Sequence, residues 1–175
     1  MAKSLKAGTA YLVGLECGPI KIGVTSNNPR KRWKAARKSF SNDYWVNCAY
    51  EIELYGTWSH QYAYMVEKLS HMYLIDHRIT GEWFDVSIHK ARKAVAKVIR
   101  LLDTGWQTRV VKGDWFRRHG LKNKDIVACF GMDADAVMEK YNRLSKSDWG
   151  DPIEQKQEKL RQVYQSKKKR KTNIR

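Results

Sequence analysis

The stretch TAYLVGLECGPIKIGVTSNNPRKR, residues 9–32, decides the fold of this chain. It contains two short apolar runs, residues 10–13 and residues 20–24, that are typical of β-strands. Residues 16–19 separate the runs and include a Gly-Pro pair, which favours a turn. The pattern therefore predicts a β-hairpin.

A basic helix is predicted directly after this hairpin. Asn28 supplies a cap, Pro29 suits the first helical turn, and residues 30–39 contain no helix breaker. The cations on this helix are Arg30, Lys31, Arg32, Lys34, Arg37 and Lys38. Its surface should be strongly positive.

The next residues alternate between strand and helix patterns. Residues 44–54 mix aromatic and β-branched side chains and favour a third strand. Apolar residues at helical spacing predict a helix over residues 61–78, and a short aromatic strand is expected at residues 82–86. Ser87 can cap a further helix over residues 87–102. This order predicts an α+β fold, in which a small mixed or antiparallel sheet is flanked by helices.

The sequence changes character near Gly105, where we place a domain boundary. Short helical patterns follow over residues 114–119 and 123–144, and the second resembles a helix-turn-helix with Gly131 at its turn. The residues expected to face inward are Ile126, Phe130, Met132, Val137 and Tyr141. Acidic residues on the second of these helices would repel phosphates, so a helical bundle packed on the first domain and a dimerising surface remain alternatives.

A last helix is predicted to open at Asp151-Pro152. It leads into residues 167–171, a block of like charge that should stay disordered unless bound. The chain thus divides into a domain of residues 1–104, a small helical segment of residues 105–150, and a C-terminal helix with a disordered basic tail over residues 151–175.

The charge balance points to a polyanionic partner. The chain of 175 residues has 34 Lys and Arg against 18 Asp and Glu, a formal net charge of +16. Such a charge attracts DNA, although an RNA-binding or ribosome-associated protein could be equally basic. The residues expected to bind nucleic acid are Arg30, Lys31, Lys34, Arg37, Lys38, Lys168, Lys169 and Arg170.

Cysteine use and hydropathy favour a cytoplasmic protein. Cys17, Cys48 and Cys129 are odd in number and lack a CxxC pairing, so the sequence predicts neither a disulfide framework nor a zinc site. No segment approaches the roughly 20 apolar residues that span a bilayer, and no signal peptide is expected. Membrane partners are therefore not expected.

An ordered series of motifs across residues 8–86 resembles the GIY-YIG nuclease superfamily, in its phage-type branch with KIG at the second motif. The motifs are, in order, Thr9-Ala10-Tyr11 at the place of GIY, Lys21-Ile22-Gly23 at the place of YIG, Pro29 to Arg32 with a helix arginine, Glu67 and His71, His77-Arg78, and Gly81-Glu82-Trp83-Phe84. The resemblance implies a GIY-YIG-like fold and an endonuclease that hydrolyses phosphodiester bonds of double-stranded DNA. It also implies that the protein works in the cytoplasm of a bacterium or of a phage-infected host cell.

The resemblance also implies roles for particular residues. Tyr11 would take the proton of the attacking water, but a free phenol titrates near about 10 and needs help. Lys21 could lower the pKa of Tyr11 by its positive charge, or could act on the water directly. Arg32 is expected to clamp the phosphate, because its guanidinium matches a pair of phosphate oxygens. His71 joins these catalytic residues, while His60 and His77 are weaker candidates for a proton donor.

Glu67 is the expected metal ligand, with Mg²⁺ or Mn²⁺ as the cofactor. One carboxylate suffices for one-metal hydrolysis, because Mg²⁺ keeps several waters and takes phosphate oxygens as further ligands. Each residue also has an ordinary structural interpretation: Tyr11 as a core aromatic, Lys21 and Arg32 as solvated charges, and Glu67 as a helix partner of His71.

A second class of function remains open, namely a non-catalytic DNA-binding protein or regulator on the same scaffold. The basic helix has no histidine, where many relatives carry one, and no asparagine follows Glu67 before Asn123. The sequence leaves the oligomeric state undecided, and a homo-oligomer is compatible with it.

Overall fold

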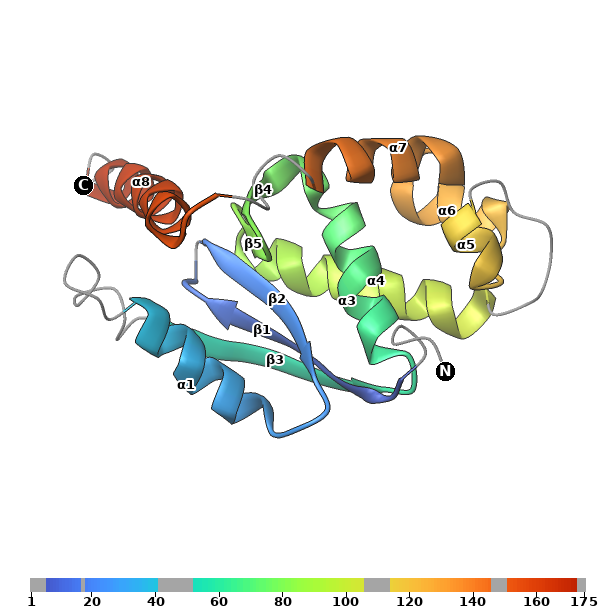
Figure 1. Cartoon of the computed structure of the whole chain (residues 1–175), viewed down its shortest axis with the longest axis horizontal. Coiled ribbons are helices and arrows are strands. Elements are labelled where there is room, and N and C mark those ends of the chain that lie inside the picture. Colours follow the sequence, from blue (N-terminus) through green and yellow to red (C-terminus); the bar gives the residue numbers. More distant parts are fainter. Residues whose placement is uncertain (1–5, 17, 41–51, 106–113, 146–150, 173–175) are drawn as a thin grey trace.

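The computed structural model describes residues 6–16, 18–40, 52–105, 114–145 and 151–172. They form an α+β fold around a five-stranded antiparallel sheet with the order β3-β1-β2-β5-β4 (Figure 1). The strands are β1 (Gly8–Gly14), β2 (Ile20–Thr25), β3 (Glu53–His60), β4 (Arg78–Thr80) and β5 (Trp83–Phe84). The predicted fold class is confirmed.

β1 and β2 form the hairpin predicted from residues 9–25. Tyr11 lies opposite Gly23 in the antiparallel register. Two backbone hydrogen bonds close the turn, from Gly18 N–H to the Leu15 carbonyl at 2.8 Å and from Leu15 N–H to the Pro19 carbonyl at 3.1 Å. The two central strands of the sheet are therefore joined by a tight local connection.

Alternation of side chains divides this hairpin between two layers. One face packs on α3 (Ala63–Tyr73) and α4 (Ile88–Gly105), and the other packs on α1 (Pro29–Phe40) (Figure 1). The buried hairpin residues in the core with α3 and α4 are Ala10, Leu12, Ile20 and Ile22. Tyr11 and Val13 instead join a smaller cluster with Ala36 of α1. Tyr11 thus belongs to the α1 side of the sheet.

α1 begins where the sequence predicts it. The Asn28 side chain accepts a hydrogen bond from the Arg30 backbone N–H at 2.9 Å. Trp33 packs on Val13 and the surrounding cluster, and its indole N–H donates to the Ile52 carbonyl at 2.8 Å. The apolar side of the helix is anchored, so its charged side faces outward.

The third strand differs from the prediction. It spans Glu53–His60 instead of residues 44–54, and residues 41–51 lie outside the described part of the chain. β3 pairs along the length of β1, with Ala10 opposite Trp58. This long-range pairing selects a segment that contains Gly56 and polar residues, whose local propensity for strand is weak.

The helix predicted over residues 61–78 is shorter in the structure. α3 ends at Tyr73, a single 3-10 turn η2 (Ile75–His77) follows, and β4 then pairs with β5. The apolar periodicity indeed ends at Tyr73, and the residues beyond it gain backbone partners in the sheet. α4 matches its prediction closely, and the Lys90 backbone N–H donates to the capping Ser87 hydroxyl at 3.3 Å.

The C-terminal helices pack on the core of the first part of the chain. They are α5 (Asp114–Arg118), α6 (Asn123–Phe130) and α7 (Ala134–Ser145). Gly131 has a left-handed φ of 75° and ends α6, as the predicted turn requires. Ile126, Val137 and Tyr141 are buried as expected, within the same core cluster as α3 and α4. The helices cover α3 and α4 (Figure 1).

The last helix, α8 (Ile153–Thr172), contradicts the expected disorder of residues 167–171, because it continues through them. Lys167 forms an ion pair with Asp85, which offsets part of the repulsion within the basic block. Leu160 packs on Leu15 and Ile52 at the edge of the sheet. Throughout the described ranges, no helix combines the length and apolar character that a bilayer crossing demands.

Candidate active site

A cleft of about 460 Å³, here called the central cleft, opens between α1, α3 and the hairpin. The residues that line it are Tyr11, Lys21, Val24, Arg32, Tyr64, Glu67, Lys68, Glu82 and Trp115. Four of the five predicted catalytic residues therefore meet in one place, although they come from four separate elements, β1, β2, α1 and α3.

The predicted catalytic residues can line one cleft because β2 pairs with β5 over only part of its length. In the described part of the chain, β5 pairs with β2 only at Ile20 and Lys21. The outer half of β2 has no strand neighbour on that side. Glu67 of α3, which covers one face of the sheet, can therefore line the same cleft as Tyr11, which belongs to the other face.

The contact between Tyr11 and Gly23 explains why the second motif, Lys21-Ile22-Gly23, ends in glycine. The Tyr11 ring lies directly over Gly23 on the paired strand. A Cβ atom at Gly23 would lie 2.4 Å from both the Cζ and the hydroxyl oxygen of Tyr11, which is far closer than atoms can approach. The absent side chain thus creates the space that holds the phenol against the hairpin.

The Tyr11 phenol is strongly shielded, with only 4% of the residue exposed. Burial, together with the smaller effects of the negative charges of Glu82 and Glu67, raises the pKa of Tyr11 to about 12, while the positive charge of Arg32 acts in the opposite direction. The phenol is therefore protonated at neutral pH in this state of the protein.

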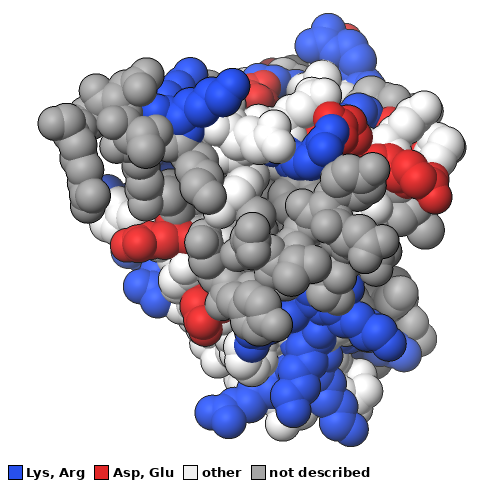
Figure 2. Space-filling view, turned by 90° about the vertical axis from the view of Figure 1, so that its left-hand side faces the viewer, with Lys and Arg blue, Asp and Glu red and all other residues white. Residues whose placement is uncertain are grey.

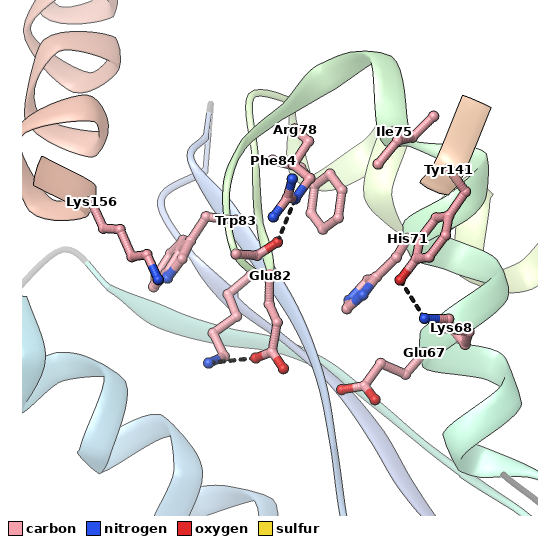
Figure 3. Close-up of a pocket in the computed structure, with 12 residues that line it drawn as sticks. Glu67, Lys68, His71, Ile75, Arg78, Glu82, Trp83, Phe84, Tyr141 and Lys156 are labelled. Carbon is pink, nitrogen blue, oxygen red and sulfur yellow. Dashed lines mark hydrogen bonds and ion pairs between the residues drawn. The ribbon is translucent and has the colours of Figure 1, made fainter. Parts of the chain in front are cut away.

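Lys21 does not occupy the position expected for a partner of Tyr11. Its ammonium forms an ion pair with the Glu82 carboxylate, with 2.7 Å between Nζ and Oε2 (Figure 3). The sequence predicted that Lys21 lowers the pKa of Tyr11, but the surroundings of Tyr11 raise its pKa, because Glu82 engages the ammonium and itself raises that pKa.

Glu82 is a residue of the cleft to which the sequence assigned no role. Burial tends to raise its pKa, but Lys21, His71 and Arg32 together hold the pKa of Glu82 below its ordinary value. It is therefore ionised at neutral pH. Its place in the Gly81-Glu82-Trp83-Phe84 block was the only sequence signal available.

His71 lies beside the central cleft, where it supports β2. Its Nε2 donates a hydrogen bond to the Ile22 carbonyl at 2.9 Å, and its ring packs on Phe84 with 5.2 Å between ring centres. Burial lowers the pKa of His71 to about 4, although the hydrogen bond to Ile22 and the charge of Glu82 oppose this. The imidazole is neutral at pH 7 and fixes the unpaired edge of β2.

A second hollow of about 440 Å³, here called the side pocket, adjoins the central cleft (Figure 3). The two share Lys21, Glu67, Lys68 and Glu82. The other residues that line the side pocket are His71, Ile75, Arg78, Gly81, Trp83, Phe84, Tyr141 and Lys156. Residues of α7 and α8 thus complete a wall that the first part of the chain leaves open.

The other two histidine candidates make contacts outside the cleft. His60 Nε2 lies 3.2 Å from a carboxylate oxygen of Asp103, and Lys90 Nζ lies 2.6 Å from His77 Nε2. Neither histidine lines the central cleft or the side pocket. Both have ordinary surface partners.

The basic helix α1 extends from the central cleft along the surface. Arg30, Lys31, Lys34 and Lys38 are exposed, and the Arg37 guanidinium lies 5.1 Å from the centre of the Trp33 ring. Figure 2 views the molecule from the left-hand side of Figure 1 and shows Lys and Arg side chains gathered at the bottom, where α1 lies. Lys169 and Arg170 are exposed on α8, whereas the side chain of Lys168 lies outside the described set.

Sequence reasoning missed Trp115, Tyr64 and Lys68 as cleft residues. Lys68 donates from Nζ to the Tyr141 hydroxyl at 2.6 Å, so α3 and α7 are joined at the cleft. Trp115 belongs to α5 and stacks on His119, with 4.3 Å between ring centres. Trp115 enters the site only through the packing of a distant helix, whereas Tyr64 and Lys68 lie beside the predicted Glu67 on α3, and that proximity was the available signal.

The donor set for a metal ion is sparse. Among the described residues, no group of three or more His, Cys, Asp or Glu side chains could hold a metal. Glu67 and Glu82 nevertheless line both hollows, and their carboxylates face the same space in Figure 3. A hard cation that keeps most of its waters fits such a site, whereas a fully protein-coordinated ion does not.

The fold and the site define an α+β domain that combines a cleft of mixed charge with a strongly basic helix. Residues 8–99 match the T5orf172 domain, and the chain belongs to this family. The T5orf172 domain is phage-associated and is related to a nuclease-type fold. No curated protein and no solved structure matches the chain. Trp115, Tyr141 and Lys156 lie beyond the matched residues.

Proposed function

We propose that this protein is a metal-dependent DNA endonuclease of the GIY-YIG type, which hydrolyses phosphodiester bonds with one Mg²⁺ or Mn²⁺ ion. The observation that carries the proposal is the convergence of Tyr11, Lys21, Arg32 and Glu67 around one cleft beside a basic helix. The motif order in the sequence and the phage-associated family support the same assignment.

The cleft residues divide the chemistry among themselves. Arg32 binds two non-bridging oxygens of the phosphate and stabilises the charge that develops on them. Water attacks phosphorus, and its proton passes to Tyr11 in its ionised form or to Lys21 in its uncharged form. The bond to the leaving oxygen breaks, and that oxygen takes up a proton from solvent. The incoming phosphate competes with Glu82 for Lys21, which brings this ammonium toward the reacting groups.

Glu67 would hold the metal ion, and Glu82 lies close enough to orient its waters. When bound, the ion supplies Lewis-acid stabilisation of the phosphate and of the leaving oxygen. Positive charge in the cleft also offsets the two carboxylates that raise the pKa of Tyr11. His71 keeps β2, and with it Lys21, in place.

Supercoiled plasmid, incubated with Mg²⁺ or Mn²⁺, tests the proposal. We expect the parent protein to convert it to nicked or linear DNA, and we expect Glu67→Ala and Tyr11→Phe to lower the rate by at least about a hundredfold. Lys93→Ala is the control, because Lys93 is an exposed cation of α4 to which no DNA contact is assigned, and it should keep the cleavage rate within a few fold. Absence of cleavage by the parent protein on every DNA form would overturn the enzyme assignment.

A second candidate is a non-catalytic DNA-binding protein on the same scaffold. Two observations favour it, namely the protonated Tyr11 phenol and the ion pair that engages Lys21. The same plasmid assay separates the candidates when it is paired with binding measurements. Salt-sensitive binding without any metal-dependent cleavage is the result expected for this alternative.

A further inference from the structure

The side pocket has the size of a site for one small molecular unit. Its volume of about 440 Å³ lies within the range of pockets that enclose a small ligand, and it cannot admit a duplex. It shares Lys21, Glu67 and Lys68 with the central cleft. A group seated there is therefore a direct neighbour of a phosphate bound in the central cleft.

The walls of the side pocket combine ring surfaces with cations. Trp83 is half-buried and presents a ring, which is a surface on which a nucleobase can stack, and the neutral His71 and the buried Tyr141 also line the pocket (Figure 3). Lys156 of α8 reaches toward Trp83 at the rim (Figure 3). Among the described residues Lys156 has no carboxylate partner, so its charge is available to a phosphate.

Arg78 is held in place at the same pocket. Its Nε donates to the Gly81 carbonyl at 2.9 Å, and its Nη1 donates to the Leu144 carbonyl at 2.7 Å. These bonds tie the turn between β4 and β5 to the end of α7. The wall of the side pocket therefore combines residues of the β4–β5 turn and of α7, and these hydrogen bonds hold it in place without a ligand.

We propose that the side pocket binds one unpaired nucleotide that flanks the phosphate in the central cleft, with its base against Trp83 and its phosphate at Lys156. The inference rests on the proposed action on DNA and adds a substrate class, namely duplexes that contain an unpaired or readily extruded nucleotide. A damaged or mismatched base leaves the stack at the lowest energetic cost, so such sites are preferred.

Binding without metal tests the pocket separately from cleavage. Two duplexes with equal numbers of phosphates are compared by fluorescence anisotropy in the presence of EDTA. The first is fully paired except for an abasic site at its end. The second contains a thymine opposite an internal abasic site. We expect the second to bind roughly tenfold more tightly. Equal affinities would overturn the proposal and would leave the nuclease assignment untouched.

Lys156→Met and its matched control Lys159→Met distinguish the pocket from general charge. Both remove one cation from α8, but only Lys156 lines the pocket. We expect Lys156→Met to reduce the preference at least threefold, and Lys159→Met to keep it. An equal reduction by both variants would assign the preference to general charge and would contradict the pocket.

Photocrosslinking of the unaltered protein avoids any doubt about folding of variants. The unpaired thymine is replaced by 5-iodouracil, and the crosslinked tryptic peptides are identified by mass spectrometry. We expect crosslinks in residues 79–90, which contain Trp83, or at Tyr141. Crosslinks confined to α1 or to Trp115 would place the nucleotide elsewhere and overturn the proposal.

Discussion

At the scale of single residues, the contact between Tyr11 and Gly23 is a close steric constraint within the candidate active site. The sequence showed both residues within motifs, but their opposition across the hairpin emerges only from the register. The glycine is a steric requirement of the tyrosine on the neighbouring strand. One methyl group is therefore enough to disturb the candidate active site.

Gly23→Ala tests that contact. The new Cβ must displace the Tyr11 ring, so we expect single-turnover nicking to fall by about tenfold or more, and overpacking to lower the free energy of unfolding by about 1–3 kcal/mol. Nicking rates and urea denaturation measure the two effects. Unchanged nicking with a lowered stability would show that the ring position does not matter for activity.

His71 predicts a particular dependence of stability on pH. Burial lowers its pKa in the folded protein to about 4, against 6.5 for the free group, so the unfolded chain binds more protons between these values. The free energy of unfolding should therefore fall as the pH drops from about 6.5 to about 4, by up to about 3 kcal/mol. Above pH 7 this contribution is fully present.

Urea denaturation at several pH values, with His71→Gln as the comparison, measures this contribution. The variant is less stable at pH 7 but should lose less stability than the parent between pH 6.5 and pH 4.5. Parallel pH profiles of parent and variant would contradict the assignment, because the slope would then come from other groups.

At the scale of elements, the sequence predicts best where one local signal decides the structure. Asn28 and Ser87 mark the starts of α1 and α4 correctly, and Gly131 marks the turn between α6 and α7. β3 was misplaced because its bounds depend on pairing with β1, a contact between distant segments. The end of α3 was misplaced for the same reason, since β4 forms only against β5.

The candidate site was also predicted where local motifs mark its residues and missed where distant segments of the chain meet. Tyr11, Lys21, Arg32 and Glu67 lie in recognisable motifs and were predicted together, and the structure brings them to one cleft. The Lys21–Glu82 ion pair and the Trp115 wall could not be predicted, because no spacing in the sequence specifies contacts between a hairpin, a strand turn and a later helix.

The C-terminal helices should unfold together with the sheet, because Ile126, Phe116 and Leu121 are buried in the core of α3 and α4. Ile126→Ala is expected to lower the free energy of unfolding by about 2–5 kcal/mol and to keep a single transition. Circular dichroism in the far and near ultraviolet during urea titration checks this. Two separate transitions would instead support an independent domain after Gly105.

At the scale of the whole molecule, the excess of positive charge sets how DNA binding responds to salt. The formal net charge is +16, and α1 presents exposed cations beside the central cleft. We expect the double variant Lys31→Ala and Lys34→Ala to weaken binding to all duplexes alike. The slope of log K against log salt should become shallower by about 2, since each lost phosphate contact contributes about 0.9.

The matched control for this measurement removes the same charge elsewhere. Lys122→Ala with Lys124→Ala alters two cations next to the start of α6, away from α1. An equal loss of salt slope in both double variants would mean that the protein binds DNA through its general field, without a defined track along α1.

The position of α8 has a consequence for the chain's behaviour in concentrated solution. β4 is an outer strand of the sheet, and α8 packs against it while Leu160 covers Leu15 and Ile52. Without this helix, the unpaired backbone groups of β4 would meet the solvent at one edge of the sheet, where a strand from another molecule could add, and the apolar side chains of Leu15 and Ile52 would also be uncovered. The polar last helix therefore protects the sheet from aggregation. A chain cut after residue 150 should precipitate at concentrations at which the intact protein stays monodisperse.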